Sequence, residues 1–173
     1  KSPFFNTGVL IGSSVYTYKS DPVKKDSITL GEILEPKSVT PEFYIDDKDL
    51  DKWKKLKGPN SVQREKDGFK YNYSMGGIGY DDLDKPSRTI ITGEGGKSPS
   101  RFKHIIEYEK GKFRRLTPVE LEKLNGFPKD WTKLEGVTDT KRAFLMGNAL
   151  VCGVVELIGK SLFNIFRLYE WNN

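Results

Sequence analysis

The segment "RLTPVELEKLNGFP", which begins at Arg115, constrains the fold most tightly because it specifies both ends of one helix. Thr117 is typical of an N-cap, Pro118 of the first helical position, and Glu120 completes a T-x-x-E capping box. Gly126 is typical of the residue after a helix C-terminus, and the proline that follows cannot continue the helix. The sequence therefore predicts a short helix with sharply defined ends.

A broad apolar stripe at helical spacing occupies the C-terminal end of the chain. Its members are Leu150, Val151, Val154, Leu157, Ile158, Leu162, Ile165, Phe166 and Tyr169. A stripe this wide, on a helix of about five turns, needs burial against a sizeable partner surface. The single cysteine, Cys152, lies on this helix with no His or cation beside it in sequence, which favours a buried structural thiol over a nucleophile.

Shorter signals predict the remaining elements. Residues 4–18 indicate two short strands with a turn, and "SITLGEILEP" indicates a helical turn stopped by Pro36. Residues 46–57 have a helical apolar spacing that ends at Gly58 and Pro59. Residues 60–112 are rich in Gly, Tyr and turn signals, with strand-like pieces at "FKYNY", "RTIIT" and "FKHIIEYE". Together these segments predict the α+β class, with a small, irregular β-rich domain and short helices.

Composition limits the classes of function. The 173 residues fit one domain, or a small domain with an appendage. No apolar run approaches the roughly 20 residues of a membrane span, and no targeting segment is visible, so we expect a soluble chain without a membrane partner. One cysteine and one histidine, His104, predict no disulfide, no multi-His metal site and no bound metal. The cysteine content fits a reducing compartment such as the cytoplasm.

Basic residues gather between Lys97 and Arg115, where seven Lys/Arg face two Glu. Such a window is typical of a polyanion binder, although a solvated basic face on an ordinary protein has the same composition. Its first part belongs to the loop "TGEGGKSPSRFK", whose glycines expose backbone N–H groups beside basic and hydroxyl side chains. We interpret His104 as structural or phosphate-facing, and the acidic run 81–84 as a solvated turn.

Two nucleotide-binding patterns fail on inspection. "GEGGKS" lacks the first glycine of a phosphate loop, because Ile91 stands at that position. "GGIGYD" lacks the third glycine of a dinucleotide fingerprint, because Asp82 stands there.

Three stretches together resemble the C-terminal part of DNA (cytosine-5)-methyltransferases. "KPSRTIITGEGGKSPSR" is similar to the Thr-Ile/Leu strand and Gly-rich loop of that family's target-recognition domain. "RRLTPVELEKLNGFP" is similar to its R-x-L-T-x-x-E-x-x-x-x-x-G-F-P motif, and "MGNALVCGVVELIG" to its G-N-[AS]-V motif and hydrophobic helix. The family's nucleophilic Pro-Cys, its Glu-Asn-Val and its Gly-rich cofactor loop do not occur in this sequence.

The resemblance implies the C-terminal half of such an enzyme, inactive alone, whose partners are double-stranded DNA and the N-terminal catalytic half. The enzyme would transfer methyl from S-adenosylmethionine to C5 of a flipped-out cytosine, as in restriction–modification inside a bacterial or phage-infected cell. Residues 1–35 would end the catalytic domain and 36–112 would form the target-recognition domain. Residues 113–173 would hold two helices, the last packed on the missing catalytic domain.

The resemblance also implies site residues. Those expected at DNA are Arg88, Thr89, Gly93, Gly95, Gly96, Lys97, Ser98, Arg101 and Lys103. Asn148, Ala149 and Leu150 would meet the cofactor, with a backbone N–H at a helix N-terminus facing its carboxylate. Two alternatives remain: the matching half of an RNA (cytosine-5)-methyltransferase, and a stand-alone basic nucleic-acid-binding module. The Gly-rich insertion favours DNA, and the apolar C-terminal helix argues against a free module.

Overall fold

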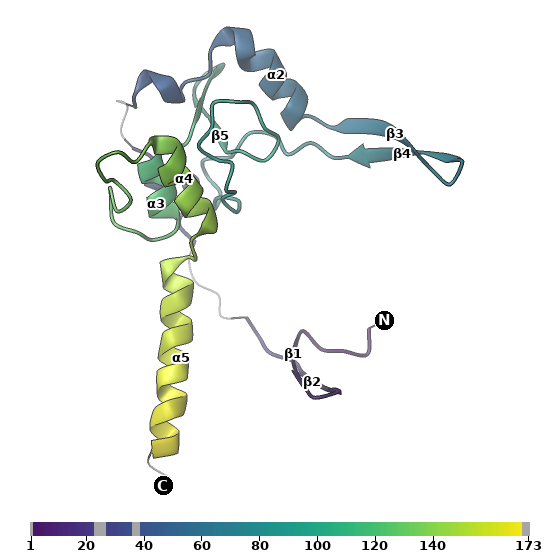
Figure 1. Ribbon diagram of the computed structural model, residues 1–173, viewed down its shortest axis with the longest axis vertical. Coiled ribbons are helices and arrows are strands. Elements are labelled where there is room, and N and C mark those ends of the chain that lie inside the picture. Colours follow the sequence, from purple (N-terminus) through teal and green to yellow (C-terminus); the bar gives the residue numbers. More distant parts are fainter. Residues whose placement is uncertain (1, 23–26, 36–38, 171–173) are drawn as a thin grey trace.

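The computed structural model describes residues 2–22, 27–35 and 39–170 and shows a mixed fold of helices and small sheets. Its helices are α1 (Leu30–Ile33), the 3-10 helix η1 (Pro41–Phe43), α2 (Asp47–Lys57), α3 (Pro118–Leu124), α4 (Asp139–Asn148) and α5 (Cys152–Glu170). Its antiparallel hairpins are β1–β2 (Thr7–Ile11, Ser14–Tyr18), β3–β4 (Asn60–Lys66, Phe69–Met75) and β5–β6 (Ile105–Glu109, Lys112–Arg115). α5, β1–β2 and β3–β4 project from a body formed by the other elements (Figure 1).

Most locally encoded elements form as the sequence predicts. The N-terminal hairpin, α2 and the strand at "FKYNY" are confirmed, and the helical turn at "SITLGEILEP" forms as α1. The proposed stop at Pro36 lies outside the described residues. The strand predicted at "RTIIT" is wrong, because this segment runs against α4 instead of beside another strand. α4 itself was not predicted.

The caps of α3 confirm the helix ends read from the sequence. The side-chain oxygen of Thr117 accepts a hydrogen bond from the Glu120 backbone N–H at 3.2 Å. The Glu120 carboxylate in turn accepts from the Thr117 backbone N–H at 2.8 Å, which completes the capping box. Gly126 follows the helix with φ of +79°, a conformation that glycine adopts without steric cost.

Glu120 also forms a buried ion pair with Arg114 at the end of β6. Both terminal nitrogens of the guanidinium donate to the carboxylate, at 2.7 and 2.8 Å, and the two side chains are 4% and 0% exposed. The backbone N–H of Glu35 donates to the same carboxylate at 2.9 Å, and the Thr117 hydroxyl donates to the Glu35 side chain at 2.7 Å. One carboxylate therefore joins β6, α3 and the segment after α1.

Two apolar clusters lie on opposite faces of the β5–β6 hairpin. Ile105 packs with Trp53 of α2 and with Phe113, while its neighbour Ile106 packs with α1, α3 and α4. Successive residues of a strand point to opposite faces, so this Ile-Ile pair serves both clusters. The larger cluster contains Leu30, Ile33, Ile106, Leu116, Leu121, Ala143 and Met146.

A second group of buried charges fastens α4 to α3. The guanidinium of Arg142 lies 3.1 Å from Glu122, 3.0 Å from Asp130 and 3.2 Å from Asp139, and its side chain is 7% exposed. Burial acts to raise the pKa of Glu122, but hydrogen bonds from Thr132 and Arg142 outweigh it, so this pKa lies below its usual value. The carboxylate therefore stays charged opposite the guanidinium.

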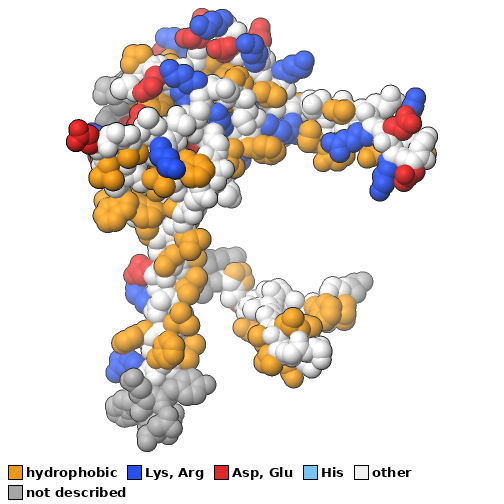
Figure 2. All heavy atoms as spheres, in the orientation of Figure 1, with side chains coloured by type: hydrophobic (Ala, Val, Ile, Leu, Met, Phe, Trp, Pro, Cys, Tyr) orange, Lys and Arg blue, Asp and Glu red, His pale blue; other side chains and the backbone are white. Residues whose placement is uncertain are grey.

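Apolar side chains remain exposed on α5 and on β1–β2 (Figure 2). On α5 these are Val154, Val155, Leu157, Ile158, Leu162, Phe163, Ile165 and Phe166. Within the described residues, the helical stretch Asp139–Arg167 is long and apolar enough to cross a membrane by length and composition alone, which is weak evidence of a span. The prediction that no stretch approaches that length is therefore wrong.

Glu120→Gln tests the buried ion pair, because glutamine preserves the capping hydrogen bond and removes the charge. We expect the free energy of unfolding to fall by about 3–5 kcal/mol, since the Arg114 charge would remain buried without its partner. Chemical denaturation measures the change. Lys112→Gln is the matched control, since it breaks an exposed pair with Glu109 and should cost less than about 1 kcal/mol. Equal small losses in both variants would contradict this role.

Candidate nucleic-acid interface and adjoining pocket

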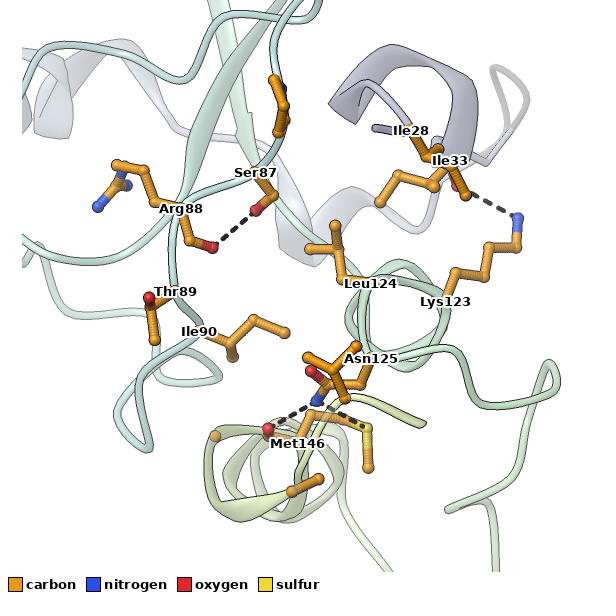
Figure 3. Close-up of a pocket in the computed structure, with 14 residues that line it drawn as sticks. Ile28, Ile33, Ser87, Arg88, Thr89, Ile90, Lys123, Leu124, Asn125 and Met146 are labelled. Atoms are coloured by element: carbon orange, nitrogen blue, oxygen red, sulfur yellow. Dashed lines mark hydrogen bonds between the residues drawn. The ribbon is translucent and has the colours of Figure 1, made fainter. Parts of the chain in front are cut away.

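A pocket of about 550 Å³ lies where the segment 86–90 meets the ends of α3 and α4 (Figure 3). Thr89 and Ile90 form one wall, opposite Leu124 and Asn125. The full lining is Ile28, Ile33, Pro86, Ser87, Arg88, Thr89, Ile90, Lys123, Leu124, Asn125, Met146, Gly147, Ala149 and Val151. The pocket thus brings residues expected at DNA next to one that is expected at the cofactor.

Asn125 organises the floor of this pocket. Its side-chain amide donates to the Met146 backbone carbonyl at 2.9 Å. The backbone carbonyl of Asn125 accepts from the backbone N–H of Cys152 at 2.8 Å. The end of α3 is therefore joined both to the end of α4 and to the start of α5. Cys152 is only partly buried, in contrast to the buried thiol predicted, because it opens the exposed α5 helix.

Gly147 allows α4 to lie directly against the backbone of the segment that passes the pocket. A Cβ at this position would stand 2.5 Å from the carbonyl group of Ile91 and from Cα of Thr92. Real Cβ atoms do not approach other atoms so closely, so an alanine here would push the helix and the segment apart. The glycine of the Gly-Asn pair is therefore a packing residue.

The residues after Gly147 end one helix instead of beginning the next. Asn148 is the last residue of α4, and its side-chain amide donates to the Phe144 carbonyl at 2.9 Å. The Ala149 N–H donates to the Met146 carbonyl at 3.3 Å, and Leu150 is exposed. The expectation of a helix N-terminus at this turn is wrong, because α5 begins later.

The Gly-rich loop rests on α4 and is shaped from inside by a lysine. A Cβ at Gly95 would lie 2.8 Å from the Cβ of Ala143, so only glycine fits this contact. Lys103 is buried, and its ammonium donates to the carbonyls of Gly96 and Ser98 at 2.5 and 2.7 Å. Burial lowers the pKa of Lys103. This side chain therefore holds the loop instead of facing outward.

Buried polar groups also lie beneath the loop. Glu94 accepts from the backbone N–H of His104, and its carboxylate lies 3.1 Å from Nδ1 of that residue. Nε2 of His104 lies 3.0 Å from the Ser87 hydroxyl, and its side chain is fully buried, so the histidine is structural. The Lys57 ammonium donates to the Lys103 carbonyl at 2.5 Å, and burial lowers the pKa of Lys57 to about 8.

The two arginines expected at DNA are engaged within the protein. Arg88 donates to Asp81 from Nε at 2.5 Å and from Nη2 at 3.0 Å. Burial acts to raise the pKa of Asp81, but the hydrogen bond from Arg88 and the other contacts of the carboxylate outweigh it and lower this pKa. Arg101 donates to the carbonyls of Gly58 and Gly76, which flank the β3–β4 hairpin.

Asp81 corrects one prediction from the sequence. Its side chain is 4% exposed and also accepts from the Ile105 backbone N–H at 2.8 Å, so it does not belong to a solvated turn. Asp82 and Asp84 are exposed, as predicted for that turn.

Several residues of the expected DNA site do face solvent. Thr89, Gly93, Lys97 and Ser98 are exposed, together with Phe102, which the sequence interpretation missed. The signal that could have found Phe102 is its position between two basic residues in a turn-rich segment. The structure thus divides the predicted residues into a buried or partly buried set that is engaged within the protein and an exposed set that is available for contact.

Comparisons with known proteins place this geometry in context. Residues 11–164 match the family of the C-5 cytosine-specific DNA methylase. The chain is 40% identical over 164 residues to type II methyltransferase M.Sau3AI of Staphylococcus aureus, an alignment that covers 94% of this chain and 38% of that protein. The crystal structure of S. pombe Dnmt2 methyltransferase shares the fold, with a TM-score of 0.57 and 17% identity over 80% of this chain and 41% of that one.

Gly147→Ala tests the close contact between α4 and the segment 91–92. We expect the free energy of unfolding to fall by about 1–3 kcal/mol, because the new Cβ overpacks against backbone atoms. Gly159→Ala is the matched control, since a Cβ at that position of α5 meets no atom within 4 Å, and alanine favours helix. Thermal or denaturant unfolding compares the two variants. A loss of the same size in both would show that the contact at Gly147 is not specific.

Proposed function

This chain belongs to the family of C-5 cytosine-specific DNA methylases, and from that membership we propose that it is the DNA-recognition part of such an enzyme. In this proposal the chain also completes one side of the cofactor site. The rest of the enzyme supplies the catalytic part, and the whole acts on double-stranded DNA in the cytoplasm. The chain spans about two-fifths of the length of the relative it matches.

The observation that carries the proposal is the apolar surface that the chain leaves uncovered. Apolar side chains on α5 and on both faces of β1–β2 are exposed, including Leu10 at 67% and Phe166 at 65%. Soluble proteins rarely expose contiguous apolar patches of this kind unless a partner covers them. A catalytic part that packs against α5 and extends the β1–β2 hairpin into a larger sheet would cover both.

In this proposal the chemical steps are divided between this chain and the catalytic part. The only cysteine of this chain, Cys152, follows Val151 and opens a helix, so the Pro-Cys nucleophile of the family resemblance must come from the catalytic part. There the thiolate would attack C6 of an extruded cytosine, and C5 would receive the methyl group that S-adenosylmethionine supplies. Loss of the C5 proton would then release the thiolate from C6. The task of this chain is to hold the DNA so that one cytosine reaches that part.

The cofactor contact is proposed for Asn148, Ala149 and Leu150. These residues fit a partial site: Asn148 is exposed, and Ala149, which follows α4, lines the pocket. The Asn148 side-chain nitrogen is engaged within α4, which leaves its side-chain oxygen and the neighbouring backbone to meet a polar ligand. Such a set forms a rim and cannot enclose a ligand, so the catalytic part would supply the remaining contacts.

The DNA contact is proposed for the exposed residues Thr89, Gly93, Lys97, Ser98 and Phe102. A lysine and hydroxyl groups are donors of the kind used on phosphates and base edges. The remaining predicted residues act through the shape of the loop: Arg88, Gly95, Gly96, Arg101 and Lys103. In this assignment Arg101 positions the loop and does not read a base.

Reconstitution tests the proposed function. We expect the chain alone to transfer no methyl group from radiolabelled S-adenosylmethionine to DNA, because it lacks the nucleophile. Mixed with the catalytic part, it should give incorporation that neither part shows by itself. The catalytic part alone is the control. Methyl transfer by the chain alone would contradict the missing-nucleophile argument, and an inactive mixture of folded parts would contradict the division of labour.

A further inference from the structure

The β3–β4 hairpin separates its side chains by chemistry between two faces. Direct cross-strand partners share a face, and the register pairs Val62 with Tyr73, Arg64 with Tyr71 and Lys66 with Phe69. These six residues form what we term the aromatic–basic face. The opposite face carries Ser61, Gln63, Glu65, Lys70, Asn72 and Ser74.

No core packing accounts for the aromatic–basic face. Every residue of the two strands is exposed except Met75, which is partly buried, and Phe69 is 72% exposed. The guanidinium of Arg64 lies 4.4 Å from the centre of the Tyr73 ring, so cation and aromatic ring form one surface. The hairpin stands clear of the body in Figure 2. Its three aromatic side chains are therefore available to a partner.

Charge is also divided between the faces. On the opposite face Lys70 lies 4.0 Å from Glu65, so the two charges offset each other. On the aromatic–basic face Arg64 and Lys66 are both positive, and within the described part of the chain neither forms an ion pair. A face with two uncompensated cations and no carboxylate complements a polyanion.

Hydrogen bonds join the hairpin to the loop proposed to contact DNA. Arg101 belongs to that loop, and its guanidinium donates to the carbonyl of Gly58, just before β3, and to that of Gly76, just after β4. Both ends of the hairpin are therefore held by one side chain of the loop. A duplex seated on the loop would lie next to the hairpin.

We propose that the aromatic–basic face of β3–β4 binds the sugar–phosphate backbone of double-stranded DNA beside the base pairs that the loop contacts. The inference rests on the proposed function and adds a second contact element to it. Arg64, Lys66 and the hydroxyl of Tyr71 supply donors to phosphate oxygens, and the ring of Phe69 packs against sugars. Strands of seven residues extend about 23 Å, which corresponds to about seven base pairs.

The test measures affinity in the complete enzyme, meaning this chain with its catalytic part. Binding of two fluorescent duplexes is compared over a range of salt concentrations: one ends close to the methylated site, and the other extends about seven base pairs further on each side. The variant is Arg64→Gln with Lys66→Gln. The matched control is Lys70→Gln, which removes a positive charge from the opposite face of the same hairpin.

We expect the double variant to lose the preference for the longer duplex. The slope of log affinity against log salt should fall by about 2, because each lost phosphate contact lowers it by about 1. Sequence preference and thermal stability should stay unchanged, and Lys70→Gln should behave as the wild type.

Three results would overturn the proposal. The double variant could bind both duplexes as the wild type does, or Lys70→Gln could reproduce its losses, which would indicate general charge alone. The double variant could also weaken association with the catalytic part while DNA affinity is unchanged, which would identify the face as a protein interface. A wild-type enzyme that binds neither duplex would instead contradict the proposed function itself.

Discussion

The buried ion pair between Arg114 and Glu120 is the constraint on which the rest of the structure depends. Two charges removed from water are tolerated only when their hydrogen-bonding groups are satisfied, and here the carboxylate also accepts from the backbone of Thr117 and Glu35. Its geometry fixes α3 against the β5–β6 hairpin and against the segment after α1. The R-x-L-T-x-x-E spacing thus places in one motif the arginine, threonine and glutamate that meet at this junction.

The pocket and the Gly-rich loop are positioned by elements that pack outward from that junction. α3 holds α4 through Arg142 and Glu122, and α4 in turn carries the Gly-rich loop at Gly95 and the 91–92 segment at Gly147. Both positions require glycine only because another part of the chain lies against them in the folded protein. The contacts therefore depend on the packing of α4 and not on the local sequence. The loop can therefore present exposed groups in a fixed arrangement while its buried charges remain inside the protein.

The sequence predicted those elements whose ends are set by interactions between residues close in the chain. The caps of α3, α2 and the two N-terminal strands follow from turn residues, capping residues and spacing within a few positions, and the structure confirms them. α4 was missed although Thr138 caps it, because its apolar positions become informative only once α3 lies beside them. The strand expected at "RTIIT" fails for the same reason: its composition favours a strand, but its neighbour is a helix.

The candidate site shows the same limit at the level of side chains. The family resemblance placed Lys103, Arg101 and Arg88 among the residues expected at DNA, and in the structure their donors are directed to carbonyls and to Asp81. Sequence cannot separate a cation that faces a ligand from one that holds a loop, because the partners are backbone carbonyls distant in the chain. The helix that carries the apolar stripe is confirmed as α5, and its described apolar side chains are exposed.

The central claim is that the catalytic part of a methyltransferase covers the exposed apolar side chains of α5 and β1–β2. Amide hydrogen exchange, measured on the chain alone and on the chain mixed with that part, tests it most directly. We expect the amides of α5 and β1–β2 to exchange rapidly in the chain alone and to become protected in the mixture, while α3 is protected in both. Unchanged exchange of α5 and β1–β2 in a mixture that methylates DNA would contradict the claim.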